Sequence, residues 1–458
     1  MRTSDKKIVK MMMVLLLTAF FFTAGLYVLG RISTPVSDSD KFNYDVKQII
    51  KSGKDVDILF LGTSRVHRST VPSVIEEKTG TGTCLVAASA SQKLDGAYML
   101  VKDLYERVHP KVIVLGVQWN SVNRDFSQFM RMESVLKSYD RMGTQSRAAY
   151  MLGHIGQDEW SQLFYLYRYR HSFYFDDLIK NIKDRTDLFR NGYEGDNDGD
   201  IYYHGMGFKY GKTALEKGNI PVGVKGIPKV DKDDPDPYMM ECLNGIVSFC
   251  KEKNIRLILY SPPEALMNLY YIENYQDAVD LYKEYAKANG IEYLDMELLR
   301  DREEILNDDM FSDAWHLCGE AAYKYSEVFG EILDKTLKGE DVGSYFYPDL
   351  ESLKRDVKRI VALQATVTTD DDSIKIDLSS LQNDDVTPLY RGEVSYDGGT
   401  TFYELFDWTA QTELEFDIKD DPDPVFRFHA WSGVTGEDEA WQLCGIGEKE
   451  GNTYEDND

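Results

Sequence analysis

Residues 57–65 read Asp-Ile-Leu-Phe-Leu-Gly-Thr-Ser-Arg, a short apolar run that stops at Gly62 and leads directly into Ser64. A short apolar run without alternation is typical of a strand that is covered on both faces. Ligands of open α/β sheets bind where such strands end. A serine on this turn would have an exposed hydroxyl and nearby backbone N–H donors. Those groups can attack a carbonyl and stabilise the resulting oxyanion.

Four more runs of this kind follow, separated by helical patterns. The runs are Cys84–Ala88, Lys111–Val117, Arg256–Tyr260 and Ile291–Leu294. Apolar residues recur at helical spacing across residues 97–108, 243–250, 276–288 and 319–337. This alternation predicts a parallel sheet with helices on both faces.

Residues 121–235 interrupt this alternation of strands and helices, because they contain no convincing buried strand. Their centre is aromatic and basic, from Trp160 through Phe175, with Arg168, Arg170 and His171 among the aromatic residues. We interpret this segment as a mostly helical insertion on the carboxyl edge of the sheet, facing an anionic sugar polymer.

The N-terminal segment contains twenty residues without a charge, Met11–Gly30. At 1.5 Å per residue this run spans about 30 Å, the thickness of a bilayer's hydrocarbon core. Positive charges precede it, so the positive-inside rule predicts a cytoplasmic N-terminus and an exported remainder. A cleaved signal peptide is the alternative, although its apolar region is usually shorter. The preceding cations are Arg2, Lys6, Lys7 and Lys10.

The composition changes again near residue 360. Residues 360–458 carry 24 acidic and 5 basic side chains, and alternating patches such as Val425–His429 predict an all-β sandwich. Trp408, Trp431 and Trp441 could be sugar platforms, but we expect at least two of them in the sandwich core.

These patterns divide the chain into seven parts. They are a cytoplasmic tail (1–10), a transmembrane anchor (11–30), a tether or short helix (31–55), an α/β domain (56–340) with its insertion (121–235), a linker helix (341–359), an acidic β-sandwich (360–450) and a frayed tail (451–458).

The overall composition excludes several classes of protein. A net charge of −26 without a Lys/Arg cluster argues against nucleic-acid binding, which needs a basic face. The five cysteines contain no CxxC pair, so they indicate neither a disulfide framework nor a zinc cage. We expect buried free thiols, and no metal site.

Asp313-Ala-Trp-His316 lies just before the last helix of the α/β region. Three-residue spacing puts both side chains on one side of a helical turn, where Asp313 could accept from one imidazole nitrogen. The other nitrogen would then be able to take a proton from a serine. The alternative is a surface Asp and His at a helix N-terminus, where Asp is a common cap.

A serine after the first strand and Asp-x-x-His before the final helix resemble the SGNH (GDSL-like) hydrolase superfamily, over about residues 55–335. The segment Ser89–Gln92 with Asp95–Tyr98 resembles the second block of a membrane-anchored Firmicutes branch. More distantly, the chain is similar to cell-envelope acyltransferases. The resemblance implies a flavodoxin-like three-layer α/β/α fold and a catalytic triad of Ser64, His316 and Asp313.

The sequence departs from the family pattern in three blocks. The first block reads Gly-Thr-Ser instead of Gly-Asp-Ser, and the second-block glycine is replaced near Ala88, whose backbone N–H remains available. The third block, Gly116–Asn120, lacks the usual Gly-x-Asn-Asp, so Asn120 and Gln118 are rival oxyanion donors. Candidate substrate-binding residues are Arg65, Gln92 and Trp119, although Trp119 is expected in the core.

The sequence therefore predicts a single-pass membrane protein with an exported serine esterase or O-acyltransferase domain. Its expected substrate is an acylated cell-envelope glycan or a small acyl ester, and the chemistry requires no metal or organic cofactor. Its other expected partner is the membrane, through one N-terminal helix, and it binds no nucleic acid. The alternative is a catalytically silent glycan-binding or scaffold protein, which the altered third block favours.

Overall fold

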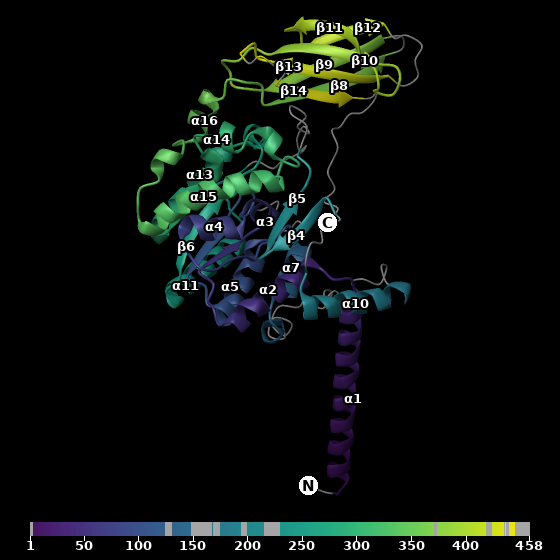
Figure 1. Ribbon diagram of the computed structural model, residues 1–458, viewed down its shortest axis with the longest axis vertical. Helices are drawn as coiled ribbons and strands as arrows, with labels where there is room; N and C mark the ends of the chain where they lie inside the picture. Colours follow the sequence, from purple (N-terminus) through teal and green to yellow (C-terminus); the bar gives the residue numbers. More distant parts are fainter. Residues whose placement is uncertain are drawn as a thin grey trace.

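A computed structural model of the 458-residue chain describes residues 3–123, 131–147, 167, 175–193, 199–214, 230–370, 373–417, 424–434, 436 and 439–444. A long N-terminal helix projects from one end of the molecule, and a β-sandwich lies at the other (Figure 1). The α/β domain lies between them.

A five-stranded parallel sheet forms the centre of the α/β domain, with strand order β2-β1-β3-β6-β7. The five predicted strands are therefore confirmed, and their order is that of a flavodoxin-like sheet. The order reverses between β1 and β3, so these two strands flank the place where such sheets bind ligands. The strands are β1 (Ile58–Leu61), β2 (Cys84–Val86), β3 (Val112–Gly116), β6 (Arg256–Ser261) and β7 (Glu292–Asp295).

Helices cover both faces of this sheet because successive residues of each buried strand point to opposite sides. Ile58 and Phe60 of β1 belong to one hydrophobic cluster, whereas Leu59 and Leu61 belong to another. The first cluster includes residues of α3 (Ser64–Ser69), α4 (Pro72–Thr79), α12 (Leu266–Tyr271), α13 (Tyr275–Asn289) and α15 (Gly319–Lys338). The second includes residues of α2 (Asp38–Ser52), α5 (Leu94–Val108) and α11 (Pro237–Lys253).

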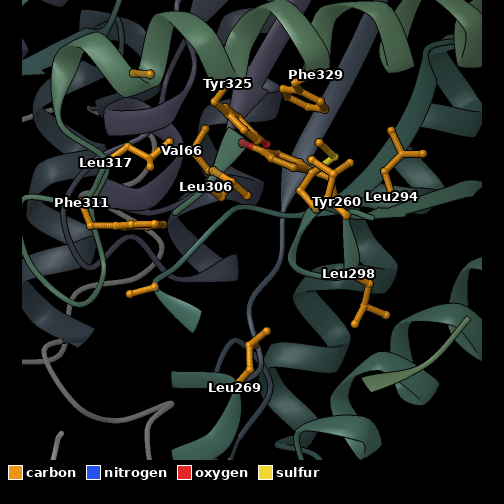
Figure 2. Close-up of a cluster of buried hydrophobic side chains, with 14 of the residues drawn as sticks. Val66, Tyr260, Leu269, Leu294, Leu298, Leu306, Phe311, Leu317, Tyr325 and Phe329 are labelled. Atoms are coloured by element: carbon orange, nitrogen blue, oxygen red, sulfur yellow. The ribbon is translucent and has the colours of Figure 1, made fainter. Parts of the chain in front are cut away.

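An aromatic stack joins the sheet to α15 (Figure 2). Tyr260 of β6 stacks on Phe329 with ring centroids 4.9 Å apart, and Tyr325 stacks on Phe329 at 5.5 Å. Val66 of α3 lies beside this stack, in the same cluster. The helix that follows Ser64 is therefore anchored in the core.

The segment at 31–55 contains a short helix, which was one of the two expected alternatives, and this helix is part of the folded domain rather than a free tether. Helix α1 runs from Thr3 to Ser33, and α2 begins after a capping box in which Ser37 and Asp40 each accept a backbone N–H of the other. Phe42, Val46 and Ile49 of α2 are buried in the second cluster. They recur at helical spacing, so one face of α2 covers the sheet.

The part of α1 from Lys7 to Ser33 is long and apolar enough to cross a membrane. A signal sequence would have the same properties, and the structure contains no membrane.

The insertion contains a β-hairpin besides its helices, and the strands of this hairpin are only partly buried. Strands β4 (Ile201–Gly205) and β5 (Phe208–Gly211) pair antiparallel, and Tyr203 and Phe208 are buried. The Met206 carbonyl accepts the Val86 N–H at 2.9 Å, which places the hairpin against the end of β2.

The helices of the insertion include α7 (Arg131–Arg141) and α10 (Phe175–Asn191). Most of the aromatic and basic stretch between them lies outside the described residues.

The C-terminal part is an all-β sandwich, as predicted. One sheet has the order β11-β10-β13-β14, the other β12-β9-β8, and apolar side chains from both form a third cluster. The strands are β8 (Ala362–Asp370), β9 (Ser373–Leu381), β10 (Leu389–Ser395), β11 (Tyr403–Thr409), β12 (Glu413–Asp417), β13 (Val425–Trp431) and β14 (Ala440–Cys444).

The sandwich tryptophans lie outside this core, so the expectation that at least two are buried there is wrong. Trp408, Trp431 and Trp441 are only half-buried. Phe426, Phe428 and Ala430 of β13 point into the core, and the alternation of the strand sends Trp431 to the opposite face. Its ring lies 5.6 Å from that of Trp408.

A short linker joins the two domains through helix α16 (Leu350–Asp356). Val361 and Ala362 pack in the first cluster of the α/β domain, whereas Ile360 packs in the sandwich core. Arg359 forms ion pairs with Asp308 (2.6 Å) and Glu303 (3.0 Å). The boundary at residue 360 is therefore a packed junction.

Candidate active site

Ser64, His316 and Asp313 form a continuous hydrogen-bonded chain. The Ser64 Oγ lies 2.7 Å from the His316 Nε2. The His316 Nδ1 lies 2.8 Å from the Asp313 Oδ2 and 3.1 Å from the Oδ1. All three side chains are half-buried, so the site is accessible from solvent. This geometry places one imidazole nitrogen on a hydroxyl and the other on a carboxylate.

The turn that presents Ser64 depends on close packing at the ends of β1 and β3. Ser64 is the first residue of α3, and Thr63 caps the helix by accepting the Arg65 N–H. Gly62 has φ +144°, and a Cβ there would lie 2.5 Å from a methyl group of Val66. A Cβ on Gly116 would meet the same methyl group at 2.5 Å. Two glycines thus allow α3 to begin directly against the sheet.

The loop before α15 positions His316. The Asp313 side chain accepts the backbone N–H groups of Trp315 (2.7 Å) and His316 (2.8 Å). These residues form a bent loop outside any helix, whereas a helical turn was expected. Burial opposes the charge of Asp313, but His316 and these hydrogen bonds lower its pKa to about 2. Asp313 is therefore a carboxylate at neutral pH, and it fixes which imidazole nitrogen faces Ser64.

Two arginines of α3 connect this helix to the loop that carries His316. The guanidinium of Arg65 lies 4.6 Å from the centroid of the Trp315 ring and forms a buried ion pair with Glu264 at 2.9 Å. Arg68 donates to the Ser312 Oγ at 2.8 Å and to the Leu317 carbonyl at 3.4 Å. The loop is thus fixed on both sides of His316.

The ion pair belongs to a larger buried cluster. Arg302 pairs with Glu297 at 3.1 Å and also donates to the Glu264 carbonyl. Asn268 donates to the Glu264 carboxylate at 3.1 Å and to the Ala314 carbonyl at 2.6 Å. Burial and the nearby charge of Glu264 raise the pKa of Glu297 well above its ordinary value. The cluster links the end of β6 to the loop that carries His316.

Of the three oxyanion candidates, two lie against the turn that carries Ser64. Ala88 is buried, and the next N–H, that of Ser89, donates to the Gly62 carbonyl at 3.2 Å. The Gln118 amide donates to the Thr63 hydroxyl. Asn120 makes no side-chain hydrogen bond within the described part of the chain. Gln118 therefore contacts the turn that carries Ser64.

The three substrate-binding candidates are all buried. Gln92 accepts the Ser89 hydroxyl at 3.1 Å. Trp119 is only 4% exposed and packs in the first cluster, where a sugar cannot stack on it. Arg65 is engaged by Glu264 and Trp315. The structure thus gives these residues supporting positions within the fold.

Two residues that no motif indicates also lie at the site. His67 is on the same helix as Ser64, and its Nδ1 donates to the Ala88 carbonyl at 3.3 Å. Burial and the nearby cations Lys209 and Arg141 lower its pKa well below the ordinary value, so the ring is neutral. Arg141 of α7 also donates to the Ala88 carbonyl. The segment after β2 is therefore held by the insertion as well as by α3.

The five cysteines are free and buried, as predicted. Cys318 lies at the N-terminus of α15, close in sequence to His316. Within the described residues, no group of His, Cys, Asp and Glu side chains has the arrangement of a metal site.

No family model and no curated protein matches the chain. Among solved structures, a Bacteroides fragilis protein provisionally assigned as an acylhydrolase is 12% identical, covers 64% of this chain and 95% of its own, and has a TM-score of 0.30. A GDSL-like lipase from Bacteroides thetaiotaomicron is also 12% identical, with 64% and 99% coverage and a TM-score of 0.29. A two-domain esterase active on acetylated mannans, co-crystallised with mannopentaose, is 11% identical, with 88% and 90% coverage and a TM-score of 0.30. Because these scores are low, the fold assignment rests on strand order.

Proposed function

We propose that this protein is a membrane-anchored serine esterase or O-acyltransferase that acts on acylated glycans of the cell envelope. The observation that carries the proposal is the chain of hydrogen bonds from Ser64 through His316 to Asp313. The Ser64–His316 distance is 2.7 Å and the His316–Asp313 distance is 2.8 Å. An activated serine needs a base within hydrogen-bond reach and a third group that orients the base. Both are present.

The proposed reaction passes through an acyl-enzyme. Ser64 Oγ attacks the ester carbonyl while the Nε2 of His316 takes the hydroxyl proton. The carbonyl then re-forms, the alcohol leaves with the proton from His316, and the acyl group remains on Ser64. Water or an acceptor hydroxyl, deprotonated by His316, next attacks the acyl carbon. When this second intermediate collapses, Ser64 leaves and its Oγ takes the proton back from His316. Asp313 stabilises the imidazolium in both steps.

Backbone and amide donors at the strand ends would stabilise the oxyanion. The first N–H groups of a helix have no partner within that helix, and Ser64 opens α3. The Gln118 amide reaches the same turn. These donors are fixed by the core, so they need not reorganise when the negative charge forms.

Hydrolysis of an activated acetyl ester by the full chain in detergent would test this chemistry. We expect Ser64→Ala and His316→Ala each to lower the rate by about three orders of magnitude, with the double variant little worse, because the triad acts as a unit. Cys318→Ser is the matched control and should retain activity. A covalent serine probe should label the wild type and spare Ser64→Ala.

The outcomes separate three hypotheses. A folded chain that binds glycan, resists the probe and is unaffected by Ser64→Ala would be the silent binding protein. Activity lost only in Cys318→Ser would identify a cysteine nucleophile. If the triad is active, adding an oligosaccharide acceptor and measuring acylated product against free acid distinguishes transfer from hydrolysis.

A further inference from the structure

Helix α10 lies across the outer end of α1 (Figure 1). The Asn181 amide donates to the Ser33 carbonyl at 2.7 Å. The Arg185 guanidinium donates to the carbonyls of Thr34 and Pro35, both at 3.1 Å. These carbonyls are at or just beyond the C-terminus of α1, where they have no helical partner. Helix α10 therefore caps the end of the apolar helix.

A buried carboxylate fixes this junction. Asp40 of α2 pairs with Arg185 of α10 at 2.9 Å and also with Arg31 of α1. Burial alone would raise the pKa of Asp40, but the two arginines lower it below the ordinary value, so it is charged. One carboxylate thus joins three helices, and α10 cannot swing away from α1 without leaving a charge unpaired.

The position of this junction sets the depth of α10 relative to a bilayer. The apolar run of α1 ends at Gly30, and Ser33 follows three residues later. At 1.5 Å per residue, Ser33 lies about 4.5 Å beyond the hydrocarbon core. The interfacial layer on each side of that core is about 5–8 Å thick. A helix bonded to the Ser33 carbonyl is therefore at the level of the lipid headgroups.

Helix α10 exposes an apolar face at this depth. Ile179, Ile182 and Phe189 are 76%, 39% and 54% exposed, and their spacing places them on one side of the helix. Asn181, Arg185 and Leu188 are buried on the adjacent side, about 100° around the helix. Most soluble proteins expose such residues singly, so three on one helix face indicate a contact surface. Beside this face are the exposed cations Lys183 and Arg190, which suit anionic headgroups.

We propose that α10 is an interfacial helix, and that its Ile179–Ile182–Phe189 face inserts into the outer leaflet at the base of α1. This inference rests on the proposed membrane anchor and is independent of the esterase chemistry. With α1, α2 and α10 joined at Asp40, the membrane contact fixes the height and tilt of the α/β domain. The candidate active site is thus held at a constant distance from the membrane.

Photo-crosslinking in a bilayer tests the proposal directly. The full chain would be reconstituted into vesicles of phosphatidylethanolamine and phosphatidylglycerol, with benzoylphenylalanine replacing Ile182 in one sample. The matched control replaces Asp184, which is also exposed but lies on the other side of the same helix. We expect several-fold more lipid adduct, measured by mass spectrometry, at 182 than at 184. A second pair, Ile179 and Lys180, should show the same preference.

Equal labelling of the two sides, or crosslinks only to another protein in native membranes, would overturn the interfacial role. A chain that alkaline carbonate washes from the vesicles would contradict the anchor and this inference together. Ester hydrolysis measured on the same samples keeps the two proposals separate. Lipid labelling at 182 in an inactive chain would contradict only the proposed catalytic function.

Discussion

Arg65, the residue after Ser64, forms an ion pair with Glu264 in which both side chains are almost fully buried and the N–O distance is 2.9 Å. The same guanidinium stacks on Trp315, the neighbour of His316. The distance between helix α3 and the loop that carries His316 therefore depends on a carboxylate other than Asp313. We expect Glu264 to act as a positioning residue, and its contribution is measurable.

Glu264→Gln should lower both stability and turnover. The substitution keeps the shape of the side chain but leaves the charge of Arg65 buried without its partner, a loss that costs about 3–5 kcal/mol in buried pairs. We expect kcat to fall more than KM rises, because loop geometry changes while the binding surface remains. Urea unfolding and steady-state kinetics on the activated ester measure both effects.

Glu303→Gln is the control, since Glu303 also pairs with an arginine but its side chain is 51% exposed. An exposed pair contributes about 0–1 kcal/mol. Equal destabilisation by the two variants would contradict the positioning role of Glu264.

Asp313 should make stability pH-dependent under acidic conditions. Its pKa is about 2 in the folded chain against an ordinary value of 3.8. As pH falls, the unfolded chain binds the proton first, so the stabilisation by Asp313 is complete above about pH 4 and is lost between about pH 4 and pH 2. The stability difference between the wild type and Asp313→Asn, from urea unfolding, should shrink across that window. A constant difference from pH 5 to pH 3 would show that Asp313 is not a stabilised carboxylate.

Gln118 should contribute to the rate, whereas Asn120 should not. If the Gln118 amide donates to the oxyanion, its removal should cost about 10²–10³ in kcat, the range for one such donor. Gln118→Met removes the amide and keeps most of the volume. Asn120→Ala is the matched control, and the measurement is kcat on the activated ester. A larger loss from Asn120→Ala would reverse the assignment.

The central sheet could be predicted because its strands are apolar on both faces and end in turns. When apolar strands of this kind alternate with helical patterns along the chain, few sheet topologies are possible. The proximity of Ser64 to His316 also follows from chain order, because Ser64 begins one helix and His316 shortly precedes another at the carboxyl edge of one sheet. These features depend on local patterns, which the sequence contains in full.

Other features depend on tertiary contacts. The β4–β5 hairpin has only short strands, and its buried residues Tyr203 and Phe208 are isolated in sequence from the sheet that they cover. No motif marks Arg141, which reaches the Ala88 carbonyl only because α7 folds back. Trp431 could have been placed correctly, because strict alternation in β13 puts it on the face opposite Phe428.

The α/β domain should fold without the sandwich, provided that α2 is complete. Phe42, Val46 and Ile49 belong to one hydrophobic cluster with the sheet, so α2 contributes to the core. A fragment of residues 34–358 keeps all three, whereas a fragment of residues 45–358 loses Phe42 and the capping box at Ser37. We expect the longer fragment to unfold cooperatively and the shorter one to be insoluble or much less stable, because removing a buried Phe side chain costs about 3–5 kcal/mol.

Both fragments end before Val361 and Ala362, which pack in the α/β core of the whole chain. The longer fragment should therefore melt below the α/β transition of the full chain, and extending it to residue 362 should recover part of the difference. Thermal unfolding followed by circular dichroism measures the three midpoints. If residues 45–358 were as stable as residues 34–358, α2 would be a dispensable tether after all. If residues 34–358 were insoluble, the two domains would share one folding unit, and the junction at Arg359 would be part of it.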